Sequence, residues 1–142
     1  MALQFPPKVG TIVICDYQTG FKEPEMIKER LAVVMSPRLP HRDNLCTVVP
    51  LSSTVPHHNT LYQVRIELPM EAPTPYAGRF KWAKSDMMAT VGYGRLSLPY
   101  TGRDPSTGKR KYLQIILVED ELAKVRASLL FALGLGHLTK HL

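Results

Sequence analysis

The sequence lacks an apolar stretch long enough to span a lipid bilayer. Its longest such run, Ala127 to Leu135, is interrupted by Ser128 and Gly134, whereas a spanning helix needs about 20 apolar residues. The first eight residues also lack the pattern of a secretory signal, a charged segment followed by an apolar run and a small-residue cleavage site. We therefore expect a protein of the cytoplasm.

Cysteine is scarce, which excludes a disulfide framework. The two cysteines, Cys15 and Cys46, both lie within apolar, strand-like runs. In that setting a free cysteine more often acts as a small buried hydrophobe than as a redox or metal-binding group.

Clusters of metal-binding residues are also missing. His57 and His58 lie in a polar loop with no cysteine or acidic residue at ligand spacing. His137 and His141 stand four residues apart, but Gly134 is expected to end the helix before them. We expect no metal and no cofactor.

Acidic residues are the minority among the charges. There are 18 Lys and Arg against 12 Asp and Glu, a formal charge of +6, and this balance favours polyanionic partners. Hydrophobic residues make up 44% and charged residues 21%, which excludes a disordered chain. A length of 142 residues predicts one domain over residues 1–142 with a core of its own.

Short runs of β-branched and aromatic residues alternate with turn signals along most of the chain. We expect six strands of this kind: Thr11–Tyr17, Leu31–Met35, Cys46–Leu51, Leu61–Leu68, a segment around Met88–Val91, and Lys111–Val118. Several short strands separated by turns predict a barrel or a sandwich. Residues 102–111 contain Asp104, Pro105 and Gly108, which predict a hairpin tip that carries a basic cluster.

The period of the apolar residues changes near the C-terminus. Between residues 120 and 133, leucine and valine recur at spacings of three and four, which predicts an amphipathic helix: Leu122, Val125, Leu129 and Leu133. A helix at this end of the chain would cover a face of the β structure.

The segment Gln18 to Arg30 is predicted to be a long polar loop between the first two strands. It contains Gly20, Pro24 and six charged side chains. Ordered loops of this length are often functional.

Several of these segments together resemble MazF/PemK-family toxins. The resemblance rests on GTIVICDY, the polar loop with Gly20 and Glu25, Arg30 before LAVVMSPR, then TVVPLSST and KSDMMATVGYGRL, from about Lys8 to Leu98. It implies a mainly β fold, an SH3-like barrel with a C-terminal helix, and usually a homodimer. It further implies a metal-independent endoribonuclease that cleaves single-stranded RNA, the toxin of a type II toxin-antitoxin pair whose antitoxin is a small acidic protein.

The resemblance also implies which residues carry the chemistry. Arg30 would stabilise the charged phosphate, because a guanidinium can donate two parallel hydrogen bonds to phosphate oxygens. Ser52 would contact the reacting phosphate through its hydroxyl. Lys84 and Asp86 resemble a basic-x-acidic pair in which the cation is the acid or an electrostatic partner and the carboxylate is the base. The alternatives are a solvated Arg30, a simple turn at Ser52 and a surface ion pair between Lys84 and Asp86.

Other residues are expected to bind RNA around that centre. Phe21 takes the place of a histidine found in some PemK-type members, so it cannot titrate but could stack on a base. The remaining RNA-binding candidates are Lys22, Glu25, Lys28, Arg38, Ser53 and Thr54. The basic insert of residues 100–111 is longer than the family usually has. Because Phe21 and Lys84 depart from the pattern, the competing hypothesis is a catalytically inactive barrel that binds RNA or a protein partner.

Overall fold

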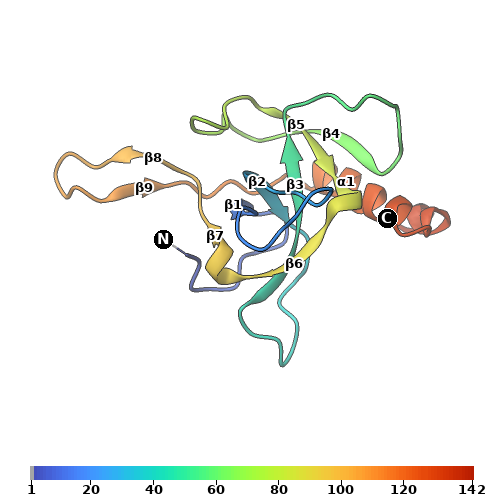
Figure 1. Ribbon diagram of the computed structural model, residues 1–142, viewed down its shortest axis with the longest axis horizontal. Coiled ribbons are helices and arrows are strands. Elements are labelled where there is room, and N and C mark those ends of the chain that lie inside the picture. The colour runs from blue at the N-terminus through green and yellow to red at the C-terminus, as the bar shows by residue number, and fades with distance from the viewer. Residues whose placement is uncertain (1) are drawn as a thin grey trace.

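Nine strands, one α-helix and three short 3-10 helices make up the fold, in a computed structural model that describes residues 2–142 (Figure 1). The strands are β1 (Ile12–Asp16), β2 (Glu29–Val34), β3 (Leu45–Ser52), β4 (Gln63–Glu67), β5 (Phe80–Lys84), β6 (Ala89–Gly92), β7 (Leu96–Ser97), β8 (Tyr100–Arg103) and β9 (Arg110–Tyr112). The helices are η1 (Ser85–Met87), η2 (Tyr93–Arg95), α1 (Glu119–Ala132) and η3 (Gly136–His141). The prediction of a mainly β fold with a C-terminal helix is confirmed.

Strand β3 organises the larger sheet, whose antiparallel order is β4-β5-β3-β2-β1-β7. Its first half pairs with β6, its middle with β2, and its last two residues, Leu51 and Ser52, with β5. A strand that changes partners along its length bends the sheet around it. The start of β2 and the end of β3 therefore meet near the loop that joins β4 to β5 (Figure 1).

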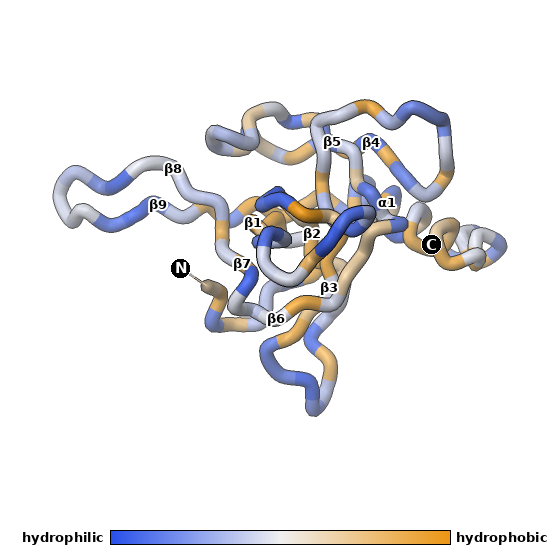
Figure 2. The backbone as a smooth tube through the Cα atoms, in the orientation of Figure 1, coloured by the Kyte–Doolittle hydropathy of each residue, from blue (hydrophilic) through white to orange (hydrophobic). Residues whose placement is uncertain are grey.

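Both faces of the central strands are buried, in two apolar clusters. In β1, Ile12 and Ile14 belong to one cluster, which also contains Leu122 of α1, whereas Val13 and Cys15 belong to the other. This is the two-residue alternation of a strand packed on both sides. Figure 2 shows the contrast between these hydrophobic central strands and the hydrophilic β8–β9 hairpin.

Strands β5, β7 and β8 were not predicted as strands, and the last predicted strand is wrong in its bounds. Strand β5 escaped prediction because its Lys81 is buried, whereas a charged residue in a short run usually indicates a solvent-exposed segment. The last strand was predicted over residues 111–118, but β9 ends at Tyr112. Beyond it, Ile115 and Leu117 pack into the core, and Ile116 makes an isolated bridge to Thr11. Hydrophobic burial with this isolated bridge, and not a regular strand, explains that apolar run.

The long first loop also ends slightly earlier than predicted. Strand β2 begins at Glu29, so Arg30 lies within a strand and not in the preceding loop.

Helix α1 runs within one residue of its predicted bounds, with Glu119, Asp120 and Glu121 in its first turn. Within residues 2–142, none of the helices combines the length and the apolar character that crossing a membrane requires.

Both cysteines are buried, as predicted, and burial raises the pKa of each thiol from 9.0 to about 11. Between pH 9 and 11 the folded chain therefore holds protons that the unfolded chain has lost, so stability falls as the pH rises through this window. We expect the urea concentration at the unfolding midpoint to be lower at about pH 10.5 than at pH 8.5. The decrease is expected to be smaller in the double variant Cys15→Ala/Cys46→Ala, which lacks both thiols. An equal drop in both proteins would contradict this.

Candidate active site

The start of β2 and the end of β3 form one wall of a pocket of about 290 Å³. Ala32 pairs with Pro50 and Val33 with Val49, so the antiparallel register brings the start of β2 alongside the end of β3. We call this hollow the basic pocket. Its lining residues are Lys28, Glu29, Arg30, Leu31, Leu51, Ser52, Ser53, Thr54, Pro75, Tyr76 and Lys81.

Arg30 carries an unpaired donor in this pocket. Its Nε is buried and has no hydrogen-bond partner among the described residues. Buried donors in native proteins are nearly always paired, so this unpaired Nε is an exception, and it belongs to a side chain that lines the pocket. A phosphate oxygen is the acceptor that a guanidinium fits best.

Three consecutive hydroxyl residues, Ser52 at the end of β3 and then Ser53 and Thr54, line the same wall. Ser52 is buried, and its Oγ accepts a hydrogen bond of 3.1 Å from the Thr54 backbone N–H. Ser53 is exposed, and its Oγ accepts a hydrogen bond of 3.1 Å from the Lys81 Nζ. In both cases the oxygen is already an acceptor, which leaves the hydroxyl hydrogen available for donation to an anion.

Lys81 is a residue that the sequence analysis did not single out. It is 2% exposed, and its Nζ donates to Ser53 Oγ, to the Tyr76 carbonyl (2.8 Å) and to the Ala77 carbonyl (3.0 Å). Burial lowers the pKa of this amine, while Glu71 acts in the opposite direction. Each of the three N–H donors of the Lys81 ammonium group has an acceptor, so Lys81 connects the β4–β5 loop to the end of β3.

A carboxylate and a phenol also line the basic pocket. The Tyr76 hydroxyl donates to Glu29 Oε1 over 2.6 Å. Burial raises the pKa of Tyr76, and the hydrogen bond to Glu29 adds to the rise, so the phenol stays a donor. Neither residue was predicted, because they lie 47 residues apart and belong to different elements.

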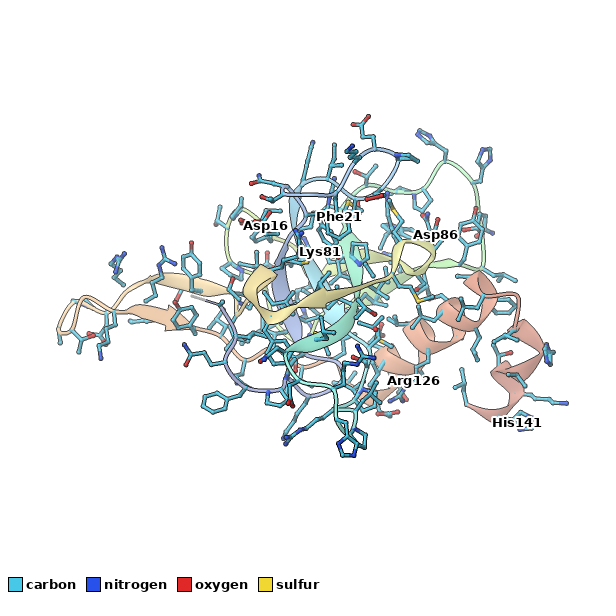
Figure 3. All side chains as sticks on the ribbon, turned by 60° about the horizontal axis from the view of Figure 1, so that its bottom comes forward. Asp16, Phe21, Lys81, Asp86, Arg126 and His141 are labelled. Atoms are coloured by element: carbon cyan, nitrogen blue, oxygen red, sulfur yellow. The ribbon has the colours of Figure 1, made fainter. Side chains whose placement is uncertain are left out.

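A second hollow of about 670 Å³ lies between the loop after β1 and η1. We call it the apolar groove, and it is lined by Tyr17, Phe21, Pro24, Glu25, Met26, Asp86, Met87, Met88 and Ala89. Phe21 packs edge-on against Tyr17 at 5.2 Å, with the Arg95 guanidinium 4.9 Å from its ring centre. Figure 3 shows Phe21, Lys81 and Asp86, which come from three different elements.

Tyr17 lines the apolar groove from the core side. Its side chain is fully buried, and among the described residues its hydroxyl has no hydrogen-bond partner. Burial raises the pKa of Tyr17, whereas the Arg30 guanidinium acts to lower it.

Most of the predicted site residues line one of the two hollows. The basic pocket brings together Arg30, Ser52, Lys28, Ser53 and Thr54. The apolar groove brings together Phe21, Glu25 and Asp86.

The other predicted residues line neither hollow. Arg38 lies in a different hollow with Lys8, Lys22 is exposed, and Lys84 lies at the end of β5 opposite Gln63. Lys84 and Asp86 form no ion pair, since Asp86 instead accepts a bond of 3.4 Å from the Gln63 amide.

Known sequences match most of this chain. A family model described as PemK-like, MazF-like toxin of type II toxin-antitoxin system matches residues 8–130. The uncharacterised protein YifN of Escherichia coli is 31% identical and covers 72% of this chain and 80% of its own length. An uncharacterised protein of Haemophilus influenzae is 32% identical and covers 95% of both chains.

Solved structures share the fold at lower identity. MazF from Deinococcus radiodurans is 20% identical, with a TM-score of 0.59, over 92% of this chain and 99% of its own. An endoribonuclease from a mycobacterial species is 19% identical, with a TM-score of 0.58, over 94% and 96%. A mycobacterial endoribonuclease in complex with its cognate antitoxin is 20% identical, with a TM-score of 0.57, over 91% and 96%.

Proposed function

The chain belongs to the family of PemK-like, MazF-like toxins of type II toxin-antitoxin systems, and from this premise we propose that it is an endoribonuclease. Its substrate is single-stranded RNA, cut in the basic pocket without a metal ion. The observation that carries the proposal is the basic pocket itself, in which Arg30 lies with the hydroxyl residues Ser52 and Ser53. Guanidinium and hydroxyl donors are groups that bind the oxygens of a phosphodiester.

The proposed reaction uses the 2′-hydroxyl of the RNA as the nucleophile. Its oxygen forms a bond to the adjacent phosphorus while the bond from phosphorus to the 5′-oxygen breaks. The products are a 2′,3′-cyclic phosphate and a 5′-hydroxyl, once the nucleophile has given its proton to the base and the leaving oxygen has taken a proton from water. Glu29, the carboxylate of the basic pocket, is the proposed base.

Electrostatic stabilisation accounts for the rest of the catalysis we propose. Arg30 and the hydroxyls donate to the non-bridging oxygens, where negative charge grows in the transition state. Tyr76 orients Glu29 through its 2.6 Å hydrogen bond. Lys28 contributes charge to a neighbouring phosphate. Each role is assigned to a side chain that lines the pocket.

The apolar groove is proposed to hold a neighbouring base. Phe21 offers a ring edge, and Met87 and Met88 offer apolar contact. Glu25 and Asp86 can accept hydrogen bonds from amino groups of a base. Because Asp86 lies in the groove and not in the basic pocket, we assign it to base recognition.

Two protein partners complete the proposal. We propose an acidic antitoxin, supported by family membership, by the formal charge of +6 and by the solved relative that is in complex with its cognate antitoxin. We also propose a homodimer, for which the exposed leucines of the C-terminal segment are candidate contacts: Leu133, Leu135, Leu138 and Leu142.

The experiment is cleavage of a mixed-sequence RNA in excess EDTA. We expect cleavage to persist, products with 5′-hydroxyl ends, and no cutting of duplex RNA. Cleavage that stops in EDTA and returns with Mg²⁺ would contradict the proposed chemistry. Binding without cutting would instead favour the inactive RNA-binding barrel.

A further inference from the structure

The β8–β9 hairpin projects from the body of the molecule (Figure 1). Every residue of the two strands is exposed, so the hairpin contributes no side chain of its strands to the buried core. An isolated two-stranded hairpin is only marginally stable in water. The fold gains little from such an arm, so its surface needs another explanation.

The hairpin is strongly basic. Residues 100–112 contain four cations, Arg103, Lys109, Arg110 and Lys111, against the single acid Asp104, so they carry +3 of the chain's formal +6. The Asp104 carboxylate accepts hydrogen bonds from the Ser106 (2.7 Å) and Thr107 (3.3 Å) backbone N–H groups. Its charge is therefore used to shape the tip, and the cations of the strands stay uncompensated.

Aromatic rings and guanidinium groups share one face of the hairpin. Tyr100 pairs with Tyr112 and Arg103 with Arg110. Directly paired residues lie on the same side of a ladder. The Arg110 guanidinium lies 4.4 Å from the Tyr100 ring centre, and the two tyrosine rings meet edge-on at 6.0 Å. Rings interleaved with cations are the chemistry that binds a single nucleic-acid strand.

The hairpin lies on the same side of the molecule as one edge of the basic pocket. Tyr76 lines the pocket and donates to Glu29. The β4–β5 loop, which carries Tyr76, reaches toward the same side of the molecule as the hairpin (Figure 1). An RNA strand that leaves the pocket on this side runs toward the hairpin.

We propose that the β8–β9 hairpin is a second binding site for single-stranded RNA, which holds nucleotides several positions away from the cut bond. Tyr100 stacks on a base, and Arg103 and Arg110 bind the phosphates along it, with Lys111 adding charge from the other face. This inference rests on the proposed function, because it extends the path of the same RNA. It makes the protein prefer long substrates over short ones.

The test compares two charge-matched double variants in binding to 2′-O-methyl RNA, whose blocked nucleophile prevents cleavage. Arg110→Gln/Lys111→Gln removes one Arg and one Lys from the hairpin. Arg42→Gln/Lys140→Gln removes the same pair from exposed positions elsewhere. Each protein is titrated with oligomers of about 5 and about 15 nucleotides, within the range of single-strand sites.

We expect the hairpin variant to bind the long oligomer about tenfold more weakly, with the slope of log K against log salt reduced by at least about 0.7 for the lost phosphate contact of Arg110. Its affinity for the short oligomer stays at the wild-type value. The control variant changes neither affinity. Tyr100→Ala weakens long-oligomer binding by about tenfold through lost stacking, whereas Tyr100→Phe does not.

The other outcomes overturn the inference in distinguishable ways. If the hairpin variant loses affinity for both oligomers equally, or for neither, the hairpin is not a separate RNA site. If the variant changes the oligomeric state while RNA binding is unchanged, the arm contacts a second copy of the chain. If the wild type binds neither oligomer, the proposed function fails together with the hairpin site.

Discussion

Replacing Arg30 by alanine is expected to lower the rate of RNA cleavage by about 10³-fold. The reason is the loss of the donor aimed at the phosphate, and removing one preorganised donor of this kind typically costs about 10²–10³ in rate. Arg30→Lys keeps the charge but cannot form a bidentate hydrogen bond, so its cleavage rate lies between those of the wild type and Arg30→Ala. The measurement is the initial rate on a single mapped cleavage site.

Stability separates this effect from a folding defect. Because the Arg30 Nε has no partner in the folded chain, Arg30→Ala removes an unpaired buried donor and leaves the free energy of unfolding within about 1 kcal/mol of the wild type. Arg126→Ala is the matched control, since Arg126 pairs with Glu119 on the surface of α1. A rate for Arg30→Ala within tenfold of the control would remove Arg30 from the catalytic centre.

Lys81→Met is expected to reduce both stability and cleavage. The change deletes three hydrogen bonds and leaves the Tyr76 and Ala77 carbonyls without their donor. Leaving buried partners unsatisfied costs about 1–3 kcal/mol of stability. Part of this cost is offset because the variant no longer has to bury a charged amine. With the β4–β5 loop released, Ser53 and Tyr76 lose their positions, so cleavage falls by at least about tenfold.

The control for this variant is Lys140→Met, since Lys140 is an exposed lysine of η3. It should change the free energy of unfolding by no more than about 0.5 kcal/mol. Urea unfolding and the cleavage rate are measured on both proteins. If Lys81→Met were as stable and as active as Lys140→Met, the tether between the loop and β3 would have no role.

Local patterns were enough to predict most elements of the fold. Runs of β-branched and other apolar residues predicted β1 to β4, the three-four spacing predicted α1, and Asp104, Pro105 and Gly108 predicted the hairpin tip. The pattern failed at β5, where carbonyls of the preceding loop make the burial of Lys81 possible. It failed again after Tyr112, where apolar residues fill the core with an isolated bridge to Thr11 and no regular strand.

The candidate site could be predicted only in part for a similar reason. The placement of Arg30 and Ser52 in one site came from the resemblance to a family, and the antiparallel pairing of β2 with β3 brings both residues to the same pocket. Glu29, Tyr76 and Lys81 belong to the pocket through long-range packing. No local pattern marks such residues, because each looks like a solvent-exposed polar residue in its own segment.

The measurement that bears most directly on the proposed chemistry is cleavage of an RNA with a single 2′-deoxyribose at the mapped cleavage nucleotide. We predict that the wild-type protein binds this strand as tightly as the all-ribose strand but does not cut it at that position, in EDTA. Cutting of the substituted strand at the same bond would show that the 2′-hydroxyl is not the nucleophile and would contradict the mechanism.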